Sequence, residues 1–327
     1  MCGIVGLLLR NPALRPRLGE LMLPILVGMS SRGPEAAGLA AFDTDPQGRL
    51  KASLFSDTPG YAWDRLSARH RERLGADANL QAIGQHAVLR SAADAAALRA
   101  WLHAEFPELH LLALGHSITL YKDVGTPTAI AERYGFARLA GTHVVGHTRM
   151  ATESAVTPAH SHPYTAGEDF CLVHNGSLSN PYEIRRMLEP RGIAFETDCD
   201  TEAACRYLEW RTREGDDLRT ALQRGFEVFD GFYTFLMGDA TQLALVRDTF
   251  ACKPAVVAEH PDWVAIASEF HALAHLPGIE SARIFEPVPE QIYVWRADPA
   301  GEAGALRPAH AAGCTTAATA AGAAQGA

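Results

Sequence analysis

The sequence predicts an α+β fold in which two antiparallel sheets lie between layers of helices, an αββα sandwich. Residues 2–9 form a continuous apolar run and predict a buried strand. Apolar residues recur at helical spacing between 17 and 31 and predict a helix. The runs 231–239 and 242–248 predict two strands joined as a hairpin. Antiparallel strands that alternate with helices along the chain favour two sheets covered by helical layers.

The other elements follow from the same patterns of apolar and turn residues. Asn180 and Pro181 predict a helix start, because proline is favoured at the first helical position. Asp94 predicts the N-cap of an earlier helix. We expect further strands near 38–42, 50–55, 82–90, 111–121, 142–149, 170–176, 254–258, 263–267 and 291–296, and helices near 63–75, 93–106, 181–190, from 201, and 216–229.

Residues 1–298 are expected to form one domain, followed by a disordered tail at 299–327. The tail is dominated by Ala, Gly and Thr and contains no aromatic residue. Such a segment cannot bury enough apolar surface to offset the entropy that ordering would cost.

Composition argues against several classes of function. The chain has 327 residues, of which 47% are hydrophobic and 20% charged, as in ordinary globular proteins. Its formal net charge of −9 argues against nucleic acid or an anionic membrane as the main partner. No apolar run is long enough for a membrane span, and the N-terminus lacks the basic region of a signal peptide. Six scattered cysteines without a CxxC pair suggest neither a zinc site nor a disulfide framework, and they fit a reducing cytoplasm.

Cys2 is the first candidate for chemistry. Removal of Met1, which a small second residue favours, would leave Cys2 with both a thiol and a free α-amine. An α-amine has an unperturbed pKa of about 7.7–8.0, so it can act as the base for the thiol of the same residue. A cysteine at position 2 means little by itself, and its interpretation depends on the motifs that follow it.

Six short motifs, in order between residues 2 and 202, together resemble the class II (Ntn-type) glutamine amidotransferases. They are CGIVG at 2–6, RGPEAAG at 32–38, GHTRMAT at 146–152, HP at 162–163, VHNG at 173–176 and DCDTE at 198–202. The resemblance implies an Ntn-hydrolase fold and a glutaminase in which Cys2 releases ammonia from glutamine. It also implies that the stretch at about 50–140, which holds no chemical motif, is an insert specific to a branch of the family.

The chemistry of glutamine hydrolysis agrees with the residues in these motifs. A tetrahedral intermediate needs donors for its oxyanion, and the side-chain amide of Asn175 and the backbone N–H of Gly176 can supply two. Taken alone, Asn-Gly would more simply be a hairpin turn. Arg149 offers bidentate geometry for the α-carboxylate of glutamine, and Asp200 an acceptor for its ammonium. By spacing alone either would be an ordinary surface ion pair. Asp198 is expected to cap the helix that follows.

The resemblance assigns three supporting residues. His162 is expected in the glutamine pocket, although a histidine in a polar loop is otherwise unremarkable. Thr152 is likewise expected to contact substrate. Arg32 is expected to brace the loop near the nucleophile, the alternative being a cation that satisfies carbonyls at a helix C-terminus.

Departures from the family pattern suggest which branch is closest. Met150 replaces the usual tryptophan, and Pro34, Glu35 and Ala36 replace the family's x-D-S turn, which loosens the match to sugar-aminating members. The chain has no room for a sugar isomerase domain and no ATP-pyrophosphatase signature. It is similar to stand-alone subunits found with glutamate-synthase-like proteins, such as the amidotransferase-like subunit of N-methylglutamate synthase (methylamine–glutamate N-methyltransferase).

That similarity implies a hetero-oligomer in which this subunit supplies ammonia to a glutamate-synthase-like partner. We expect no metal and no cofactor in this subunit, because it lacks a glycine-rich phosphate loop. FMN and iron–sulfur clusters would belong to the partner. Two alternatives remain open: a catalytically silent scaffold or regulatory subunit of the same complex, and a free-standing hydrolase of glutamine or γ-glutamylmethylamide.

Overall fold

The computed structural model describes residues 2–75, 77–150 and 157–298. The chain up to Ala297 forms one compact unit. The tail predicted at 299–327 and the predicted substrate residue Thr152 lie outside the described residues. None of the described helices has the length and apolar character that crossing a membrane requires.

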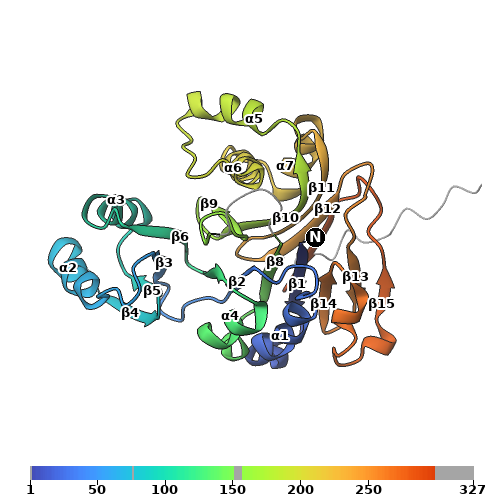
Figure 1. The fold of residues 1–327 in the computed structure, drawn as a ribbon, viewed down its shortest axis with the longest axis horizontal. Coiled ribbons are helices and arrows are strands. Elements are labelled where there is room, and N and C mark those ends of the chain that lie inside the picture. Colours follow the sequence, from blue (N-terminus) through green and yellow to red (C-terminus); the bar gives the residue numbers. More distant parts are fainter. Residues whose placement is uncertain (1, 76, 151–156, 299–327) are drawn as a thin grey trace, which may run out of the picture. The chain divides into compact units, whose positions relative to one another are not determined.

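The larger of two central sheets has seven strands, and every neighbouring pair in it is antiparallel (Figure 1). Their order across the sheet is β15 (Arg283–Phe285), β13 (Val256–Glu259), β14 (Trp263–Ala267), β1 (Gly3–Leu9), β8 (His143–Arg149), β2 (Ala36–Phe42) and β7 (Ile118–Val124). The apolar run at the N-terminus is therefore a central strand, and all seven of its residues are buried. This is why β1 reads as continuously apolar rather than alternating.

The second central sheet has five antiparallel strands. Their order is β16 (Tyr293–Arg296), β12 (Gln242–Arg247), β11 (Gly231–Gly238), β10 (Phe170–Leu178) and β9 (Tyr164–Ala166). The predicted hairpin is β11 paired with β12. One buried apolar cluster joins residues of both sheets, among them Ile4 and Val145 from the larger and Val173 and Leu236 from the smaller. The two sheets therefore pack face to face.

Helices cover the outer faces of both sheets, which confirms the predicted αββα layers. α1 (Leu18–Gly28) and α4 (Pro127–Tyr134) share a buried cluster with the larger sheet. α5 (Pro181–Leu188), α6 (Asp200–Arg213) and α7 (Leu218–Val228) share another with the smaller sheet. Short 3₁₀ helices lie at Pro12–Arg17, Phe136–Arg138, Glu189–Arg191, Phe270–Leu273 and Ile279–Ser281.

The insert adds a third sheet, which the two-sheet prediction did not include. Its order is β4 (Ala78–Ile83), β5 (His86–Ser91), β3 (Leu50–Ser56) and β6 (Leu109–Gly115), and α2 (Asp64–Leu74) and α3 (Ala95–Glu105) pack on it over a separate apolar core. In Figure 1 these elements lie together at the left. The separate sheet ends at Gly115, whereas β7 and α4 belong to the sandwich, so this layer is shorter than the insert expected at about 50–140.

Two runs predicted as single strands are each divided by a turn. The run at 82–90 is divided by Gly84, whose φ of 60° suits a tight turn between β4 and β5. The run at 111–121 turns after Gly115, and its halves enter different sheets as β6 and β7. An apolar run that crosses a short polar turn reads as one strand, because side-chain pattern alone does not mark where the chain reverses. Three short elements, α4, β9 and β15, were not predicted at all.

Three strand ends converge in the sandwich. Gly3 at the start of β1 pairs with Thr148 near the end of β8, so Cys2 lies beside Arg149. β10 belongs to the facing sheet and carries Asn175. The packing of the two sheets thus brings residues that are far apart in sequence to one edge of the sandwich.

The pH dependence of the unfolding free energy tests whether the His86 ring is buried. His86 is surrounded by the rings of Phe55, Tyr121 and Tyr134, and its Nε2 lies 3.0 Å from the Lys122 carbonyl. Burial lowers the pKa of His86 to about 4 from an ordinary 6.5. The unfolded chain therefore takes up a proton below about pH 6.5 that the folded chain does not, and stability falls as pH decreases. This one group contributes a loss of about 2 kcal/mol between pH 7 and pH 5.

We predict that His86→Phe, which suits the aromatic surroundings, reduces the difference in unfolding free energy between pH 7 and pH 5 by about 2 kcal/mol. Urea unfolding at the two pH values measures this difference. His103→Phe, on the exposed side of α3, is the control and leaves it unchanged. An unchanged pH dependence in His86→Phe would show that the buried ring is not the source.

Candidate active site

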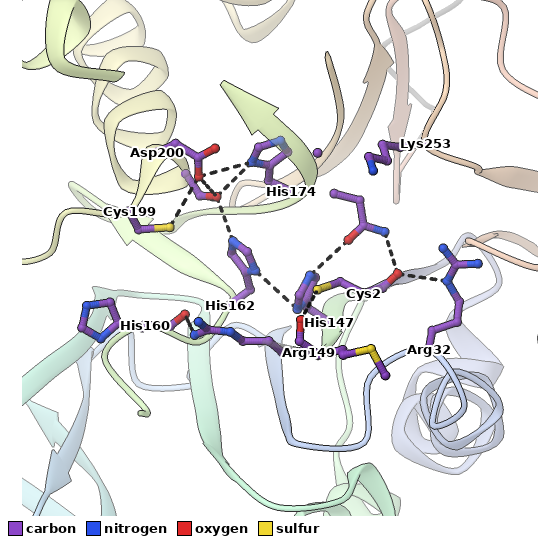
Figure 2. A pocket seen from close by; sticks show the side chains of 14 residues that line it. Cys2, Arg32, His147, Arg149, His160, His162, His174, Cys199, Asp200 and Lys253 are labelled. Carbon is purple, nitrogen blue, oxygen red and sulfur yellow. Dashed lines mark hydrogen bonds and ion pairs between the residues drawn. The ribbon is translucent and has the colours of Figure 1, made fainter. Parts of the chain in front are cut away.

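A pocket of about 280 Å³ opens where β1, β8 and β10 meet the N-terminus of α6 (Figure 2). It contains seven of the eight predicted site residues, and Thr152 is outside the described chain. The pocket is lined by Cys2, Arg32, His147, Arg149, Met150, His160, His162, His174, Asn175, Gly176, Cys199, Asp200, Thr201 and Lys253. No group of His, Cys, Asp or Glu within the described ranges is arranged to hold a metal ion.

Cys2 is held through its backbone rather than its thiol. Its carbonyl oxygen accepts hydrogen bonds from Arg32 Nε at 2.9 Å and from Asn175 Nδ2 at 3.1 Å. The half-buried thiol makes one long contact, from Sγ to the Met150 carbonyl at 3.7 Å. The thiol is therefore positioned by two strong backbone contacts while it remains accessible from the pocket.

Arg32 braces the nucleophile directly. Its side chain is only 9% exposed and its Nη1 pairs with Glu269 Oε1 at 2.7 Å. The ion pair fixes the guanidinium plane so that Nε points at the Cys2 carbonyl. Sequence reasoning placed Arg32 near the nucleophile but assigned no role to Glu269, which follows strand β14.

Asn175 and Gly176 lie inside a strand and not in a hairpin turn. Asn175 is opposite Thr234 and Gly176 opposite Tyr233 in the β10–β11 ladder. The φ of Gly176 is 139°, and a Cβ there would lie 2.0 Å from the Phe232 carbonyl oxygen. Only glycine fits this close approach of two backbones. The alternative reading of Asn-Gly as a turn is therefore excluded.

The amide of Asn175 is fully engaged. Besides the Cys2 carbonyl, Nδ2 donates to Ser268 Oγ at 3.3 Å, and Oδ1 lies 3.3 Å from His147 Nε2. Ser268 is 2% exposed and also accepts from the Ile4 N–H at 3.0 Å. The sequence analysis assigned no role to Ser268 or His147.

A chain of close polar contacts links Asn175 through His147 and His162 to Thr201, and Figure 2 labels the two histidines. His147 Nδ1 lies 3.3 Å from His162 Nδ1, and His162 Nε2 lies 2.9 Å from Thr201 Oγ1. Thr201 Oγ1 is also 3.0 Å from His174 Nδ1. One proton assignment is consistent along this chain: His174 Nδ1 donates to Thr201, Thr201 to His162, His162 to His147, and His147 Nε2 to Asn175. The single hydroxyl proton of Thr201 then goes to His162, so its 3.2 Å contact with Asp200 Oδ1 is not a hydrogen bond in this assignment. The chain thus fixes the orientation of the Asn175 amide.

Two of these histidines are neutral at pH 7. Burial lowers the pKa of His147 to about 3, although its contact with Asn175 opposes the shift. The ring of His162 is partly exposed to the pocket. Burial, and then the neighbouring His147, nevertheless lower the pKa of His162 well below its ordinary value. A neutral imidazole can accept at one nitrogen while it donates at the other, as the hydrogen-bonded chain requires.

Asp200 provides an anion at the far side of the pocket. Burial alone would raise its pKa, but the neighbouring His174 ring and a hydrogen bond from the Leu178 N–H outweigh burial and hold the pKa well below its usual range. The Leu178 N–H donates to Asp200 Oδ2 at 2.9 Å. The carboxylate is therefore charged at neutral pH and lies at the first turn of α6, where the helix dipole also favours negative charge.

The expected helix cap at Asp198 is wrong. α6 begins at Asp200, its N-cap residue is Cys199, and no side chain caps it there. Asp198 is 82% exposed and its Oδ1 lies 3.4 Å from His160 Nε2. Glu202 instead ties the helix start to the preceding loop, because it accepts from the Glu196 and Thr197 N–H groups.

Arg149 is one of the cations that line the pocket and is the last residue of β8. Its side chain is 8% exposed, and Nη1 donates to the His160 carbonyl. Lys253 also lines the pocket, with Nζ 4.9 Å from the centroid of the Phe232 ring, and had no predicted role. The pocket therefore combines a thiol, a backbone N–H beside a side-chain amide, an arginine and an ionised aspartate.

We predict that Ser268→Ala lowers the unfolding free energy by about 1–3 kcal/mol, because it leaves the buried Ile4 N–H without its acceptor and loosens Asn175. Urea titration measures the change. Ser281→Ala is the control, since its hydroxyl lies at the surface and bonds only to the nearby Gly278 carbonyl, and we expect it to stay within about 0.5 kcal/mol of wild type. Equal effects from both variants would contradict a positioning role for Ser268.

Comparisons with known proteins find glutamine amidotransferases among the relatives of this chain. A family model described as a glutamine amidotransferase domain matches residues 147–275. The chain is 45% identical over 296 residues to the glutamine amidotransferase-like protein GlxB of Rhizobium meliloti (strain 1021), covering 90% of this chain and 98% of that one. It is 32% identical over 117 residues to a glutamine–fructose-6-phosphate aminotransferase of Vibrio parahaemolyticus, covering 36% of this chain and 19% of that one.

Solved structures support the same fold. The chain matches the glutamine phosphoribosylpyrophosphate amidotransferase from B. subtilis with a TM-score of 0.56 at 19% identity, over 91% of its own length. It spans about half of that protein, 49% of its chain. On the strength of its sequence relatives and this shared fold, the chain belongs to the class II (Ntn-type) glutamine amidotransferases.

Proposed function

We propose that this protein is a glutaminase in which the thiol of Cys2 releases ammonia from glutamine. The observation that carries the proposal is the composition of one pocket: Cys2 stands beside Asn175 and Gly176, with Arg149 and Asp200 as fixed charges of opposite sign. Glutamine has an amide at one end and a carboxylate with an ammonium at the other. A single pocket with these groups can hold both ends of that molecule.

In the proposed reaction Cys2 Sγ attacks the γ-amide carbon. The α-amine of Cys2, free once Met1 is removed, takes the thiol proton and passes it to the departing nitrogen. Ammonia leaves as the C–N bond breaks, and a γ-glutamyl thioester remains. Water, deprotonated by the same amine, then attacks the thioester and releases glutamate and the thiol.

The oxyanion of each tetrahedral intermediate would be stabilised by Asn175 Nδ2 and the Gly176 N–H. Asn175 Nδ2 now donates to the Cys2 carbonyl and to Ser268, so the substrate oxygen would replace one of these acceptors. The histidine chain keeps Oδ1 turned toward His147 during that exchange. The amide therefore need not rotate to meet the intermediate.

The ammonia would pass to a glutamate-synthase-like partner carrying FMN and iron–sulfur clusters, as in N-methylglutamate synthase. Supporting this part of the proposal is the sequence similarity to stand-alone amidotransferase subunits. Glutamine is the substrate of this subunit, and its cytoplasmic location and hetero-oligomeric state are parts of the same proposal.

The role of Cys2 as nucleophile can be tested by mass, turnover and labelling. Purified protein should lack Met1 by intact mass and should release glutamate and ammonia in equal amounts from glutamine. A glutamine-like electrophile, diazo-oxo-norleucine, should label Cys2 stoichiometrically, and Cys2→Ala should lose both turnover and labelling. Cys252→Ala removes an exposed thiol and is the matched control, with activity retained.

Processed protein that leaves glutamine intact, even with its partner subunits added, would favour the scaffold alternative. Full turnover in Cys2→Ala would contradict the assigned nucleophile. Labelling at any other residue would do the same.

The second prediction concerns substrate recognition. Arg149→Lys keeps the charge but loses the planar fork that binds a carboxylate at two points. We expect KM for glutamine to rise about 10–100-fold, the equivalent of one charged hydrogen bond, with a smaller change in kcat. Arg186→Lys, at an exposed position of α5, is the control. A fall in kcat at unchanged KM would place Arg149 in the chemical step instead.

A further inference from the structure

Lys122 on β7 is a buried cation whose role the proposed mechanism leaves open. Its side chain is 5% exposed, and Nζ donates to the carbonyls of Ser161 at 2.9 Å and Pro163 at 3.4 Å. Nζ also lies 4.9 Å from the centroid of the Tyr164 ring. Burial lowers the pKa of Lys122 to about 8, so the ammonium still carries its proton at pH 7. Burial of an ammonium against carbonyls rather than a carboxylate is costly.

The carbonyls that Lys122 binds belong to one short segment, 160–163, which we call the pocket loop. The same loop holds Arg149, because the His160 carbonyl accepts from its guanidinium. The loop also lies directly against β2: a Cβ on Gly38 would be 2.1 Å from the His162 carbonyl oxygen and 2.7 Å from Lys122 Cβ. Two cations therefore fix the carbonyls of a loop that is closely packed on the sheet beneath it.

Between the two carbonyls that bind Lys122 stands His162, whose ring points into the pocket floor (Figure 2). On one side His162 contacts Thr201 at 2.9 Å, and Thr201 Oγ1 lies 3.2 Å from Asp200 Oδ1. On the other side it contacts His147, which orients Asn175. Displacement of the pocket loop would therefore reach both charged groups proposed to hold the amino-acid end of glutamine.

We propose that Lys122 is a positioning residue for glutamine binding, which sets the pocket loop and through it Arg149 and the Thr201–Asp200 pair. This inference rests on the proposed function. The effect falls mainly on binding, because Asn175 has two further partners, the Cys2 carbonyl and Ser268, that do not pass through the loop. Loss of the ammonium therefore weakens the grip on substrate more than it disturbs the oxyanion site.

Lys51 offers a matched control. It is also a fully buried lysine, and its Nζ donates to Asp43 Oδ1 at 2.6 Å and to the carbonyls of Asp43 and Ser117. It lies on β3 of the insert and does not line the pocket. Removal of its charge likewise leaves acceptors without a buried ammonium donor, but it leaves the pocket loop untouched.

The experiment compares Lys122→Met and Lys51→Met in the full chain, with active sites counted by diazo-oxo-norleucine so that misfolded protein does not contribute. We expect Lys122→Met to raise KM for glutamine about tenfold or more, with kcat per titrated site within about threefold of wild type. Lys51→Met should leave KM unchanged. Lys122→Arg, which keeps a charged donor, should recover part of the lost affinity.

A Lys122→Met protein with wild-type KM, or with the same KM as Lys51→Met, overturns the inference while wild-type turnover upholds the function. If Lys122→Met alone does not fold, Lys122→Gln, which keeps a shorter donor, is measured in the same way and must show the same rise in KM. If wild type has no turnover, the proposed function fails separately. The positioning role of Lys122 is then tested by the Kd of glutamine for Cys2→Ala and for Cys2→Ala/Lys122→Met. Equal Kd values, or no glutamine binding by either variant, overturn the inference.

Discussion

The carbonyl of Cys2 accepts hydrogen bonds from Arg32 and Asn175, and this pair of contacts determines where the thiol lies. The donors come from different layers of the fold. Arg32 follows α1 and is held by Glu269 after β14, whereas Asn175 belongs to the facing sheet. The nucleophile is thus placed by the packing of two sheets rather than by local sequence. Anything that shifts one sheet against the other changes the position of the thiol relative to its oxyanion donors.

Burial and hydrogen bonding determine which groups of the pocket are neutral and which are charged. The ring of His147 is kept neutral because dehydration lowers its pKa, while Asp200 stays ionised because the donors beside it outweigh dehydration. The neutral rings of His147 and His162 connect Asn175 to Thr201 by hydrogen bonds. They orient the Asn175 amide without adding charge near the thiol. Arg149 and Asp200 then remain as the fixed pair that a zwitterionic amino acid requires. Lys122 is a further buried cation, which does not line the pocket and instead binds the carbonyls of the pocket loop.

Sequence reasoning found the pocket because six short motifs in one order together resemble a known family. By local pattern alone, Arg149 and Asp200 would read as surface ion pairs and Asn175–Gly176 as a hairpin turn. Gly176 is an example: a close backbone approach requires glycine there, but the Asn-Gly pair alone reads as a turn. Ser268 and Glu269 were missed because their partners lie 93 and 237 residues away, and no local pattern encodes such contacts. The wrong cap at Asp198 and the two unrecognised turns, near Gly84 and Gly115, have a related cause. Residue type alone does not determine which residue opens a helix or at which turn the chain reverses.

The proposed function requires Cys2 to be the N-terminal residue and its thiol to attack the γ-amide of glutamine. The most direct test is to quench the protein with acid during turnover of glutamine and to determine the mass of its N-terminal peptide. We expect a peptide that begins at Cys2 and carries a glutamyl group. Analysis in acid keeps the α-amine protonated, so the acyl group stays on sulfur. An N-terminal peptide that stays unmodified or retains Met1 while glutamate accumulates would contradict the proposed function.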